Sequence, residues 1–343
     1  KDSNAIIRCW GGDLMKSEGA VIVKHIKDLA FMGFWEVLLN IRSIINNLSF
    51  CKKDIIEFSP DAIVYIDYPG FNLRIAKWAK NFSFNNHYYI SPQVWAWKES
   101  RVKILKECLN NLYVILPFEK KYFNEKHSLN VEYVGHPLVE NILKHKKEHS
   151  FIKKNNLDQN KEIITLMPGS RKQEIKKILP IFIDVVNKFK SYQFVIAAAP
   201  SVESEFYLSI VKNNSIKIIH NNTYNLLIHS KAALVTSGTA TLETALLKIP
   251  QLVCYKTSFV SFFIAKRLVK LNYISLVNLI LNKEVVKELI QKKCNVKKIT
   301  EELKELLIRE DKSILREYEL LTKTIGKNKA SEITSKLIIS SIK

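Results

Sequence analysis

Paired cysteines are missing from this sequence. The five cysteines are scattered, their number is odd, and no Cys-x-x-Cys pair occurs; they are Cys9, Cys51, Cys108, Cys254 and Cys294. This distribution excludes a disulfide framework and argues against a structural zinc site. We therefore expect the chain in a reducing compartment.

Long hydrophobic runs are also missing. The longest apolar stretches, 163–167 and 194–200, fall far short of the roughly 18 residues that span a bilayer. The first residues, KDSNAIIRCW, contain no apolar core of a signal peptide. We expect a cytoplasmic chain, soluble or peripheral to a membrane. Because the sequence has no initiator Met and begins with the strand-like run Ala5-Ile6-Ile7, we also expect that residues preceding it in the natural protein are missing here.

Common catalytic signatures are absent as well. Neither the Walker A pattern GxxxxGK[ST] nor GxGxxG occurs, so NTP hydrolysis and dinucleotide redox chemistry lose their main support. No histidine has an HExxH-type partner. We interpret His136 and His229 as structural or solvent-exposed residues.

Positive charge is what the sequence has in excess. Its 343 residues include 53 Lys and Arg against 33 Asp and Glu, a formal net charge of +20. Such a charge attracts nucleic acid, an anionic membrane surface or a phosphorylated substrate. Compositional bias competes with these explanations, because Lys, Ile and Asn are abundant throughout. The lysines are dispersed and no nucleic-acid-binding motif occurs, so nucleic acid is a distant alternative.

Short β-rich runs alternate with segments of helical period, which is typical of a doubly wound parallel sheet. In the first half the strands are predicted at 62–67, 87–90, 111–116 and 131–134, with helices at 73–80 and 99–107. In the second half they are predicted at 163–167, 194–199, 216–219, 232–236 and 251–255. Each run ends in a loop, and ligands bind beyond the carboxyl ends of such strands.

The pattern predicts an α/β fold with two Rossmann-like domains facing a cleft. The first domain is expected at 1–145, a polar linker at 146–160 and the second domain at 161–320, followed by a C-terminal helix at 321–343 that packs back on the first domain. An interdomain cleft is the expected ligand site.

One loop of the second half follows its first strand directly. Gly169 lets the backbone approach a ligand closely, Ser170 is a good N-cap, and the free N–H groups of the helix that follows attract an anion. Arg171 adds a bidentate donor that suits phosphate. An ordinary strand-to-helix turn with an exposed Arg is the alternative.

A second loop, at 236–243, has the same form. Small hydroxyl residues surround Gly238, and Glu243 lies about one turn into the helix, where it could accept from sugar hydroxyls. A capping box formed by Thr239 and Glu243 is the competing interpretation. Two such loops on parallel strands of one sheet converge, and a nucleotide diphosphate is their natural ligand.

The first half contributes a carboxylate and two tryptophans. Asp67 ends a strand and could act as a general base, or merely form the turn before Tyr-Pro-Gly. Trp95 and Trp97 lie in a loop-like segment, where they either line a sugar or acyl-chain pocket or fill the core. The sequence leaves both pairs of alternatives open.

The segment 32–50, MGFWEVLLNIRSIINNLSF, is apolar over more than one helical stripe. A helix of this kind is either deeply buried or docks on lipid.

Seven strings in order and register resemble one family, bacterial lipid-A-disaccharide synthase. They are IDYPGFNL, YISPQVWAWKESRVKI, LPFEKKYF, YVGHPL, LMPGSRKQEI, TSGTATLETALLKIPQLVCYK and AKRLVKLNYISLVNLIL. The resemblance implies an inverting GT-B glycosyltransferase without metal or other cofactor. It implies transfer of 2,3-diacylglucosamine from UDP-2,3-diacylglucosamine to 2,3-diacylglucosamine 1-phosphate, which yields the β(1→6) disaccharide 1-phosphate and UDP. Another GT-B UDP-sugar transferase or epimerase is the alternative.

The resemblance also assigns residues. It implies Asp67 as general base and Arg171, with Gly169 and Ser170, as ligands of the diphosphate. The nucleotide loop would comprise Ser237, Gly238, Thr239, Thr241 and Glu243, with Asn278 near the donor. The family's membrane-facing helix aligns with 33–45, which favours lipid docking at the anionic inner face of the cytoplasmic membrane through Trp35, Val37, Leu38, Ile41, Ile44 and Ile45.

Two departures from the family pattern stand out. The family's N-terminal strand and Gly-Glu-[Ala/Thr]-Ser-Gly-Asp loop have no counterpart in the sequence. If the natural protein also lacks them, its activity is in doubt. We expect instead that the sequence is truncated. Gly70 stands where some relatives carry a second acidic residue. The oligomeric state stays open, with a homodimer among the options.

Overall fold

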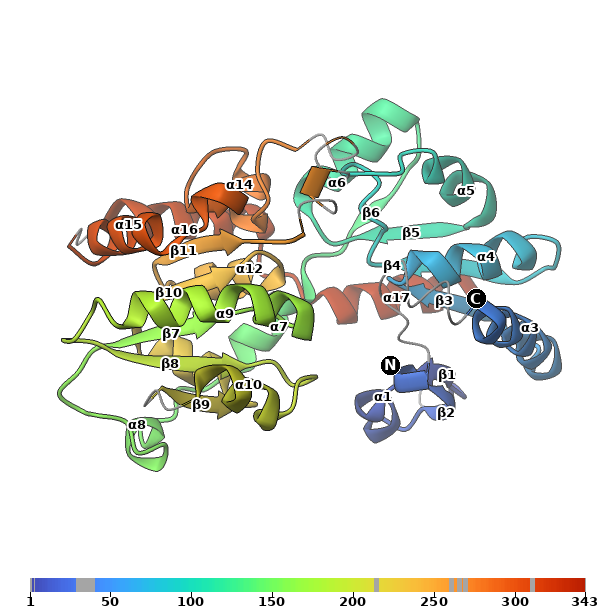
Figure 1. The fold of residues 1–343 in the computed structure, drawn as a ribbon. Helices are drawn as coiled ribbons and strands as arrows, with labels where there is room; N and C mark the ends of the chain where they lie inside the picture. The colour runs from blue at the N-terminus through green and yellow to red at the C-terminus, as the bar shows by residue number, and fades with distance from the viewer. Residues whose placement is uncertain are drawn as a thin grey trace. The chain divides into compact units, whose positions relative to one another are not determined.

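The computed structural model describes residues 2, 4–28, 41–212, 216–258, 262–263, 267, 271–308 and 312–342. The chain divides into two compact units (Figure 1). Unit 1 consists of Lys1–Ile115, Glu119–Val134 and Ser331–Lys343, and unit 2 of Leu116–Phe118 and Gly135–Ala330.

Unit 1 contains a four-stranded parallel sheet in the order β3-β4-β5-β6. Its strands are β3 (Ala62–Ile66), β4 (Asn85–Tyr89), β5 (Asn111–Val114) and β6 (Glu132–Tyr133). The helical elements that alternate with them along the chain are α3 (Ile41–Phe58), α4 (Pro69–Ala79), α5 (Arg101–Cys108), α6 (Pro117–Lys121) and the π-helical η2 (Tyr122–Lys126). Tyr88, Leu105 and Phe123 are fully buried in the core that these elements share. Because the four strands are parallel, their carboxyl ends all lie at one edge of the sheet.

A smaller parallel sheet in unit 1 pairs β1 (Arg8–Gly11) with β2 (Val21–His25) around α1 (Asp13–Ser17), and η1 (Ile26–Asp28) follows. Arg8 forms an ion pair with the buried Asp54 of α3, and Trp10 Nε1 donates to the same carboxylate at 3.2 Å. The strand predicted at 5–7 is wrong. Ile6 and Ile7 are exposed, and pairing begins at Arg8, where the side chains find buried partners.

The C-terminal segment expected at 321–343 is divided between the units. Its first residues end α16 (Lys312–Ile325), whose buried Tyr318 and Leu321 belong to unit 2. Only α17 (Ala330–Ile342) packs on unit 1, where Asn85 Nδ2 donates to the Ser341 carbonyl at 2.9 Å. The Ser341 hydroxyl lies 3.2 Å from His87 Nε2.

Unit 2 is built on a six-stranded parallel sheet in the order β12-β11-β10-β7-β8-β9. Its strands are β7 (Ile163–Met167), β8 (Gln193–Ala198), β9 (Lys217–His220), β10 (Ser230–Thr236), β11 (Gln251–Tyr255) and β12 (Lys287–Ile290). Strand order runs outward from β7 in one direction and then from β10 in the other, which is the doubly wound pattern. Sequence reasoning missed β12, a short edge strand of mixed polarity, KELI.

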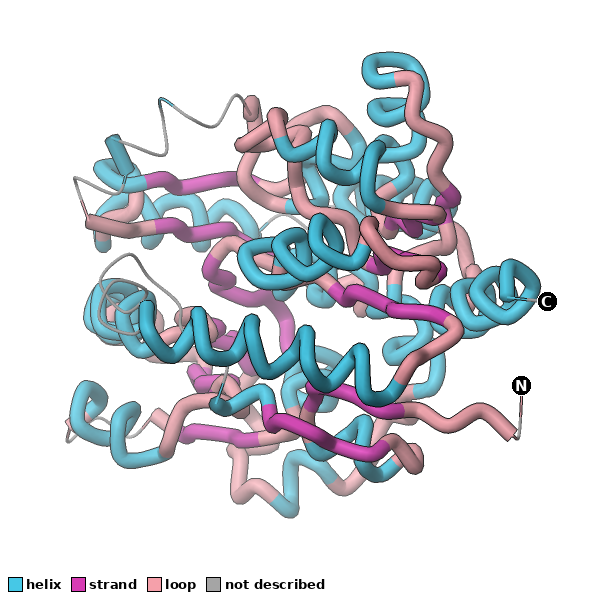
Figure 2. Tube along the Cα trace, turned by 90° about the vertical axis from the view of Figure 1, so that its right-hand side faces the viewer, coloured by secondary structure: helices cyan, strands magenta, loops and turns pink. Residues whose placement is uncertain are grey.

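Helical elements alternate with these strands along the chain (Figure 2). They are α7 (Pro137–Lys144), α8 (Phe151–Lys154), α9 (Lys172–Val186), α10 (Ser204–Val211), α11 (Thr223–Ile228), α12 (Thr239–Leu246), α14 (Leu276–Leu281), η3 (Gln291–Lys293), α15 (Val296–Ile308) and α16. Ile164 and Leu166 of β7 pack in one cluster with Phe182 of α9, whereas Ile163 packs in another with Phe151 of α8. Both faces of the sheet are therefore buried, as a parallel sheet requires.

The segment 146–160, predicted as a linker from its polar composition, is folded into unit 2. Phe151 is fully buried and stacks on His229 at 5.1 Å between ring centroids, and Leu157 is buried in the same cluster. Two apolar anchors in an otherwise polar stretch are enough to dock it on the sheet.

Candidate functional site

Asp67 lies directly after β3, in an unusual backbone conformation. Asp67 and Tyr68 both have φ of 45°, in the left-handed region that residues other than glycine rarely adopt. The Tyr88 hydroxyl donates to the Asp67 carbonyl at 2.5 Å, and Asn72 Nδ2 donates to it at 2.7 Å. Strain of this kind persists only where the surroundings enforce it, and it concentrates at functional sites.

The carboxyl group of Asp67 has a raised proton affinity. Loss of surrounding water raises its pKa, and a hydrogen bond from the Tyr68 backbone opposes part of that rise. The residue still has an exposed surface. An accessible carboxylate with a raised pKa is suited to accept a proton from a ligand hydroxyl.

The loop after β7 presents backbone groups at the start of α9. Gly169 has φ of 122°, and a Cβ there would lie 2.8 Å from Glu174 Oε2 and 2.9 Å from its Cβ, so glycine is required. The Ser170 N–H donates to Glu174 Oε2 at 3.2 Å, and Arg171 donates to Glu174 Oε1 at 3.0 Å. The prediction of Ser170 as the N-cap is wrong, because the N-cap is Arg171 and no side chain caps α9. Sequence reasoning also missed Glu174, whose carboxylate accepts from the Ser170 N–H.

The loop after β10 begins α12. Gly238 is the N-cap, with φ of 151° and ψ of −162°, a region that is almost confined to glycine. The Thr241 hydroxyl donates back to the Gly238 carbonyl at 2.9 Å, and Thr239 is the first residue of the helix. Ser237 is anchored on both sides, since its N–H donates to the Cys254 carbonyl at 3.3 Å and its hydroxyl to the Ile274 carbonyl at 2.9 Å.

These two loops lie side by side. β7 and β10 are paired with Met167 opposite Val235, so Gly169 and Ser237 each follow that pair by two residues. This is the point where strand order reverses, and ligands of open α/β sheets bind outside the carboxyl ends of strands at such a switch point. The buried Thr236 hydroxyl at the end of β10 has no hydrogen-bond partner within the described part of the chain. The edge thus combines two helix N-termini and an unsatisfied hydroxyl, a setting for an anionic, hydrogen-bonding ligand.

Glu243 is held by a partner that sequence reasoning missed. The Tyr224 hydroxyl donates to Glu243 Oε1 at 2.8 Å, and burial raises the pKa of the carboxyl group. The capping-box alternative for Thr239 and Glu243 is wrong, because the N-cap is Gly238 and no side chain caps this helix.

Asn278 is fully buried and all of its amide groups are engaged. Its Nδ2 donates to the Val286 carbonyl at 2.8 Å and to Glu288 Oε1 at 2.9 Å, and its Oδ1 accepts from the N–H groups of Val285 and Val286. The Glu288 carboxylate in turn accepts from the N–H of Ile274 at 2.9 Å. Asn278 therefore connects through Glu288 to the residue that anchors the Ser237 hydroxyl.

The two tryptophans have different surroundings. Trp95 Nε1 donates to Glu119 Oε1 at 3.0 Å, and Glu119 is buried. Trp97 is 39% exposed, with Lys98 Nζ 4.6 Å and Arg101 Cζ 5.4 Å from its ring centroid. Trp95 is therefore fixed within unit 1, whereas Trp97 is an exposed ring with two cations close to it.

The predicted lipid-facing residues are only partly within the described structure. Trp35, Val37 and Leu38 lie outside the described residues. On α3, Ile41 and Ile45 are 51% and 55% exposed, and Ile44 is half-buried. In the described part of the chain, no helix is both long and apolar enough to span a membrane.

Both singled-out histidines have structural surroundings. His136 is buried and its Nδ1 accepts from the Leu138 N–H at 3.2 Å, which caps α7, and burial lowers its pKa to about 4. His229 Nδ1 lies 2.7 Å from the Asn225 carbonyl. Within the described ranges, no three His, Cys, Asp or Glu side chains gather in a way that could hold a metal ion.

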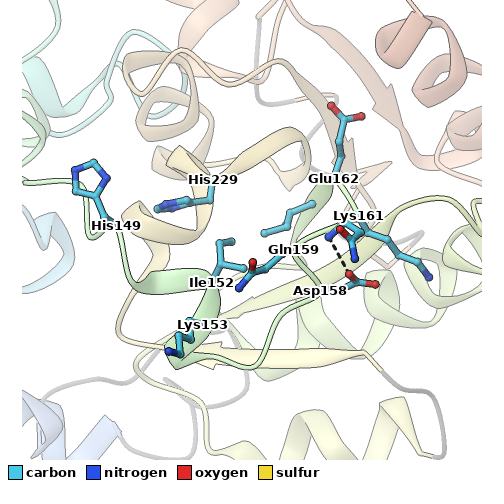
Figure 3. A pocket seen from close by; sticks show the side chains of 10 residues that line it. His149, Ile152, Lys153, Asp158, Gln159, Lys161, Glu162 and His229 are labelled. Atoms are coloured by element: carbon cyan, nitrogen blue, oxygen red, sulfur yellow. Dashed lines mark hydrogen bonds between the residues drawn. The ribbon is translucent and has the colours of Figure 1, made fainter.

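Unit 2 also has a cavity of about 500 Å³, seen in Figure 3. It is lined by Asp158, Lys161, Glu162 and His229 among others, at the amino end of β7. Because Gly169 lies past the opposite end of that strand, this cavity is separate from the two glycine loops.

Comparisons with known proteins agree with this layout. A family model described as lipid-A-disaccharide synthetase matches residues 2–341. Lipid-A-disaccharide synthase of Coxiella burnetii (strain CbuG_Q212) is 33% identical over 343 residues, covering 98% of this chain and 91% of the relative.

Solved structures share the fold at low identity. The glycotransferase of kitacinnamycin has a TM-score of 0.63 at 8% identity, covering 96% of this chain and 88% of its own. UDP-GlcNAc 2-epimerase of Methanocaldococcus jannaschii, in complex with UDP-GlcNAc and UDP, has a TM-score of 0.57 at 15% identity, covering 85% and 79%. The match along nearly the whole sequence decides the family: this chain belongs to the lipid-A-disaccharide synthases.

Proposed function

We propose that this chain synthesises the lipid A disaccharide. It transfers 2,3-diacylglucosamine from UDP-2,3-diacylglucosamine to the 6-hydroxyl of 2,3-diacylglucosamine 1-phosphate, and UDP leaves. The observation that carries the proposal is the family match over residues 2–341. The two glycine loops at the switch point of unit 2 supply the anion-binding setting that a UDP-sugar needs.

The donor diphosphate binds at the loops after β7 and β10. The backbone N–H groups of Gly169 and Thr239 and the guanidinium of Arg171 stabilise the charge that develops as UDP departs. Glu174 holds Arg171 at 3.0 Å through one N–H, and a guanidinium has four more to offer. The fold neighbour from Methanocaldococcus jannaschii, whose structure holds UDP, supports a UDP ligand for this fold.

Asp67 acts as the general base. As its carboxylate takes the proton of the acceptor 6-hydroxyl, that oxygen bonds to the anomeric carbon of the donor and the bond from this carbon to the UDP oxygen breaks, with inversion. The raised pKa of Asp67 makes it a stronger base than an ordinary aspartate.

The other assigned residues support the donor site. Glu243, fixed by Tyr224, accepts from donor hydroxyls, and Thr241 keeps the Gly238 loop in shape. Asn278 acts by positioning, because its amide holds the Glu288 side chain and the backbone of residues 285–286 rather than a ligand.

Association with the membrane completes the proposal. Ile41, Ile44 and Ile45 extend the apolar face predicted from Trp35, Val37 and Leu38, and the net charge of +20 favours the anionic inner face of the cytoplasmic membrane. Substitution of Ile41 and Ile45 by Ser is expected to reduce binding to vesicles that contain phosphatidylglycerol, measured by flotation. Unchanged flotation would contradict peripheral docking at this face.

The experiment that tests the reaction is UDP release from the diacylated donor, with diacylated or deacylated acceptor. We expect release and disaccharide formation with the diacylated acceptor alone. Equal rates with both acceptors would favour a general UDP-sugar transferase, and epimerised donor without transfer would favour an epimerase.

A further inference from the structure

Two cationic side chains lie over the ring of an exposed tryptophan in unit 1, and a third comes from the neighbouring helix α4. Lys98 Nζ and Arg101 Cζ lie 4.6 and 5.4 Å from the ring centroid of Trp97. Arg101 is the first residue of α5, and Arg74 projects from α4, which packs against α5. We name Arg74, Trp97, Lys98 and Arg101 the Trp97 cluster.

Among the described residues, the positive charges of the Trp97 cluster have no partner in an ion pair. None of the ion pairs found among the described residues uses Arg74, Lys98 or Arg101. The first turn of α5 carries no acidic residue either. Partial burial lowers the pKa of Arg101, Tyr88 opposes part of that change, and the nearby charge of Arg74 lowers the pKa further. Like charges held together in this way favour an anionic ligand.

The nearest acidic side chain in the sequence is turned to other partners. Glu99 lies between Lys98 and Ser100, yet its carboxylate pairs with Lys126 Nζ at 2.6 Å and His127 Nε2 at 3.1 Å. The Tyr122 hydroxyl donates to it at 3.1 Å. The hydrogen bond from Lys126 is the main reason that the pKa of Glu99 is lowered. Glu99 is therefore already neutralised and does not balance Lys98 or Arg101.

The Trp97 cluster lies at the same sheet edge as Asp67. β3 and β4 pair with Ile66 opposite Tyr89, so the loop that starts with Asp67 and the loop that leads to Trp97 leave from adjacent strand ends. Tyr88 connects them, because its hydroxyl donates to the Asp67 carbonyl at 2.5 Å. Burial raises the pKa of that hydroxyl, the charge of Asp67 raises it further, and the charge of Arg101 lowers it. Both charged groups are thus near one hydroxyl.

The backbone at Lys98 is strained. Its φ is 53°, in the left-handed region, although lysine has no special tolerance for it. The ammonium group of Lys98 lies over the Trp97 ring. Strained residues persist where the surrounding structure enforces them, and such sites are often ligand clamps.

We propose that the Trp97 cluster binds the phosphate monoester of the acceptor sugar, with Lys98, Arg101 and Arg74 as its ligands and the Trp97 ring against the sugar. The proposal rests on the proposed function, which supplies an acceptor with a phosphate on its anomeric carbon. A monoester carries close to two negative charges at neutral pH, which matches several uncompensated cations better than a single carboxylate would. The cluster shares a unit with the proposed base, whereas the loops proposed for the donor diphosphate belong to unit 2.

The test compares two acceptors, the 1-phosphate and its dephosphorylated counterpart, in micelles of neutral detergent. For Arg101→Gln we expect KM for the phosphorylated acceptor to rise about 10- to 100-fold, since charge-assisted hydrogen bonds are lost. KM for the dephosphorylated acceptor, and the Kd for UDP, should change less than about twofold. Lys98→Gln should show the same selectivity. Lys103→Gln is the matched control, because it removes an equal charge from an exposed position of the same helix.

Four outcomes distinguish the explanations. Selective loss for the phosphorylated acceptor supports the cluster as a phosphate site. An equal rise in KM for both acceptors, with an unchanged thermal unfolding midpoint, overturns the proposal. It would indicate that Arg101 acts on Asp67 through Tyr88. If Arg101→Gln loses binding to phosphatidylglycerol vesicles far more than Lys103→Gln does, the cluster serves lipid headgroups and the proposal is wrong. If the unaltered protein transfers sugar to neither acceptor, the proposed function itself fails, and this inference with it.

Discussion

Positive φ angles occur in the loop after β3 in unit 1 and in the loops after β7 and β10 in unit 2, but different residue types adopt them. All of them enter the left-handed or extended region of positive φ. Unit 2 uses Gly169 and Gly238 there, whereas unit 1 uses Asp67 and Tyr68. The side chains of Tyr88 and Asn72 hold the Asp67 carbonyl in place.

This difference follows from what each loop presents. A loop that binds a diphosphate offers backbone N–H groups, and a side chain at the turn would obstruct them. A loop that supplies a base must carry a carboxylate at the turn itself, so the strain is tolerated and hydrogen bonds offset it. Substitutions on the two sides should therefore separate chemistry from donor binding.

The largest expected effect is that of Asp67→Asn. Loss of the proposed general base should lower kcat by about 100- to 10,000-fold. The Kd for UDP, measured by calorimetry, should not change, since the loops proposed for the donor belong to unit 2. Normal turnover by this variant would contradict the assignment of Asp67.

Gly169→Ala tests the loop after β7 in unit 2. The added Cβ would lie within 3 Å of Glu174 in a conformation that alanine disfavours, so we expect a loss of about 1–3 kcal/mol in the free energy of unfolding. UDP affinity should fall about tenfold or more as the backbone of the loop after β7 moves.

The matched control is Gly70→Ala in α4. Gly70 has an ordinary φ and open space around it, so its substitution should be neutral or stabilise by up to about 1 kcal/mol. Similar losses of stability and UDP binding in both variants would refute the geometric argument for Gly169.

Asn72→Ala should have an intermediate effect. It removes the hydrogen bonds from Nδ2 to the carbonyls of Ile66 and Asp67, each worth about 0.5–1.5 kcal/mol. We expect kcat to fall several-fold as Asp67 loses its fixed geometry, with UDP binding unchanged. A variant that lost UDP affinity instead would show that the two loops are not functionally separate.

The smallest effect concerns pH. The folded-state pKa of Asp67 is raised, so its carboxylate destabilises the fold above that pKa, and this cost disappears as the pH falls through it. Activity should run the opposite way, because kcat is lost as the base becomes protonated. Asp67→Asn should therefore raise the thermal midpoint slightly at pH 7 but not at pH 3, and the exposed surface of the residue keeps the shift small. A lower midpoint at pH 7 would contradict this sign.

Much of the site was predictable because it depends on local chemistry. Gly169, Gly238 and Asp67 stand directly after apolar β-rich runs, and a strand followed by a glycine turn and a helix is a short-range pattern. Asn278 was identified by the family resemblance. Its contacts with Glu288 and residues 285–286 could not be predicted, because they join α14 to the segment of β12 and sequence reasoning missed that strand. The contact of Tyr224 with Glu243 was not predicted either, because the two residues are 19 positions apart in the sequence.

The sequence by itself determined the α/β class, the strands that end in the candidate loops, and the family, because each depends on patterns within a few dozen residues or on motifs in register. Tertiary structure decided which of those loops share an edge, because strand order is not written in local periodicity. It also decided that Lys98 and Arg101 both lie over one ring while Glu99 between them is paired elsewhere. Charge is counted along the chain, but whether it is compensated depends on contacts that only folding creates.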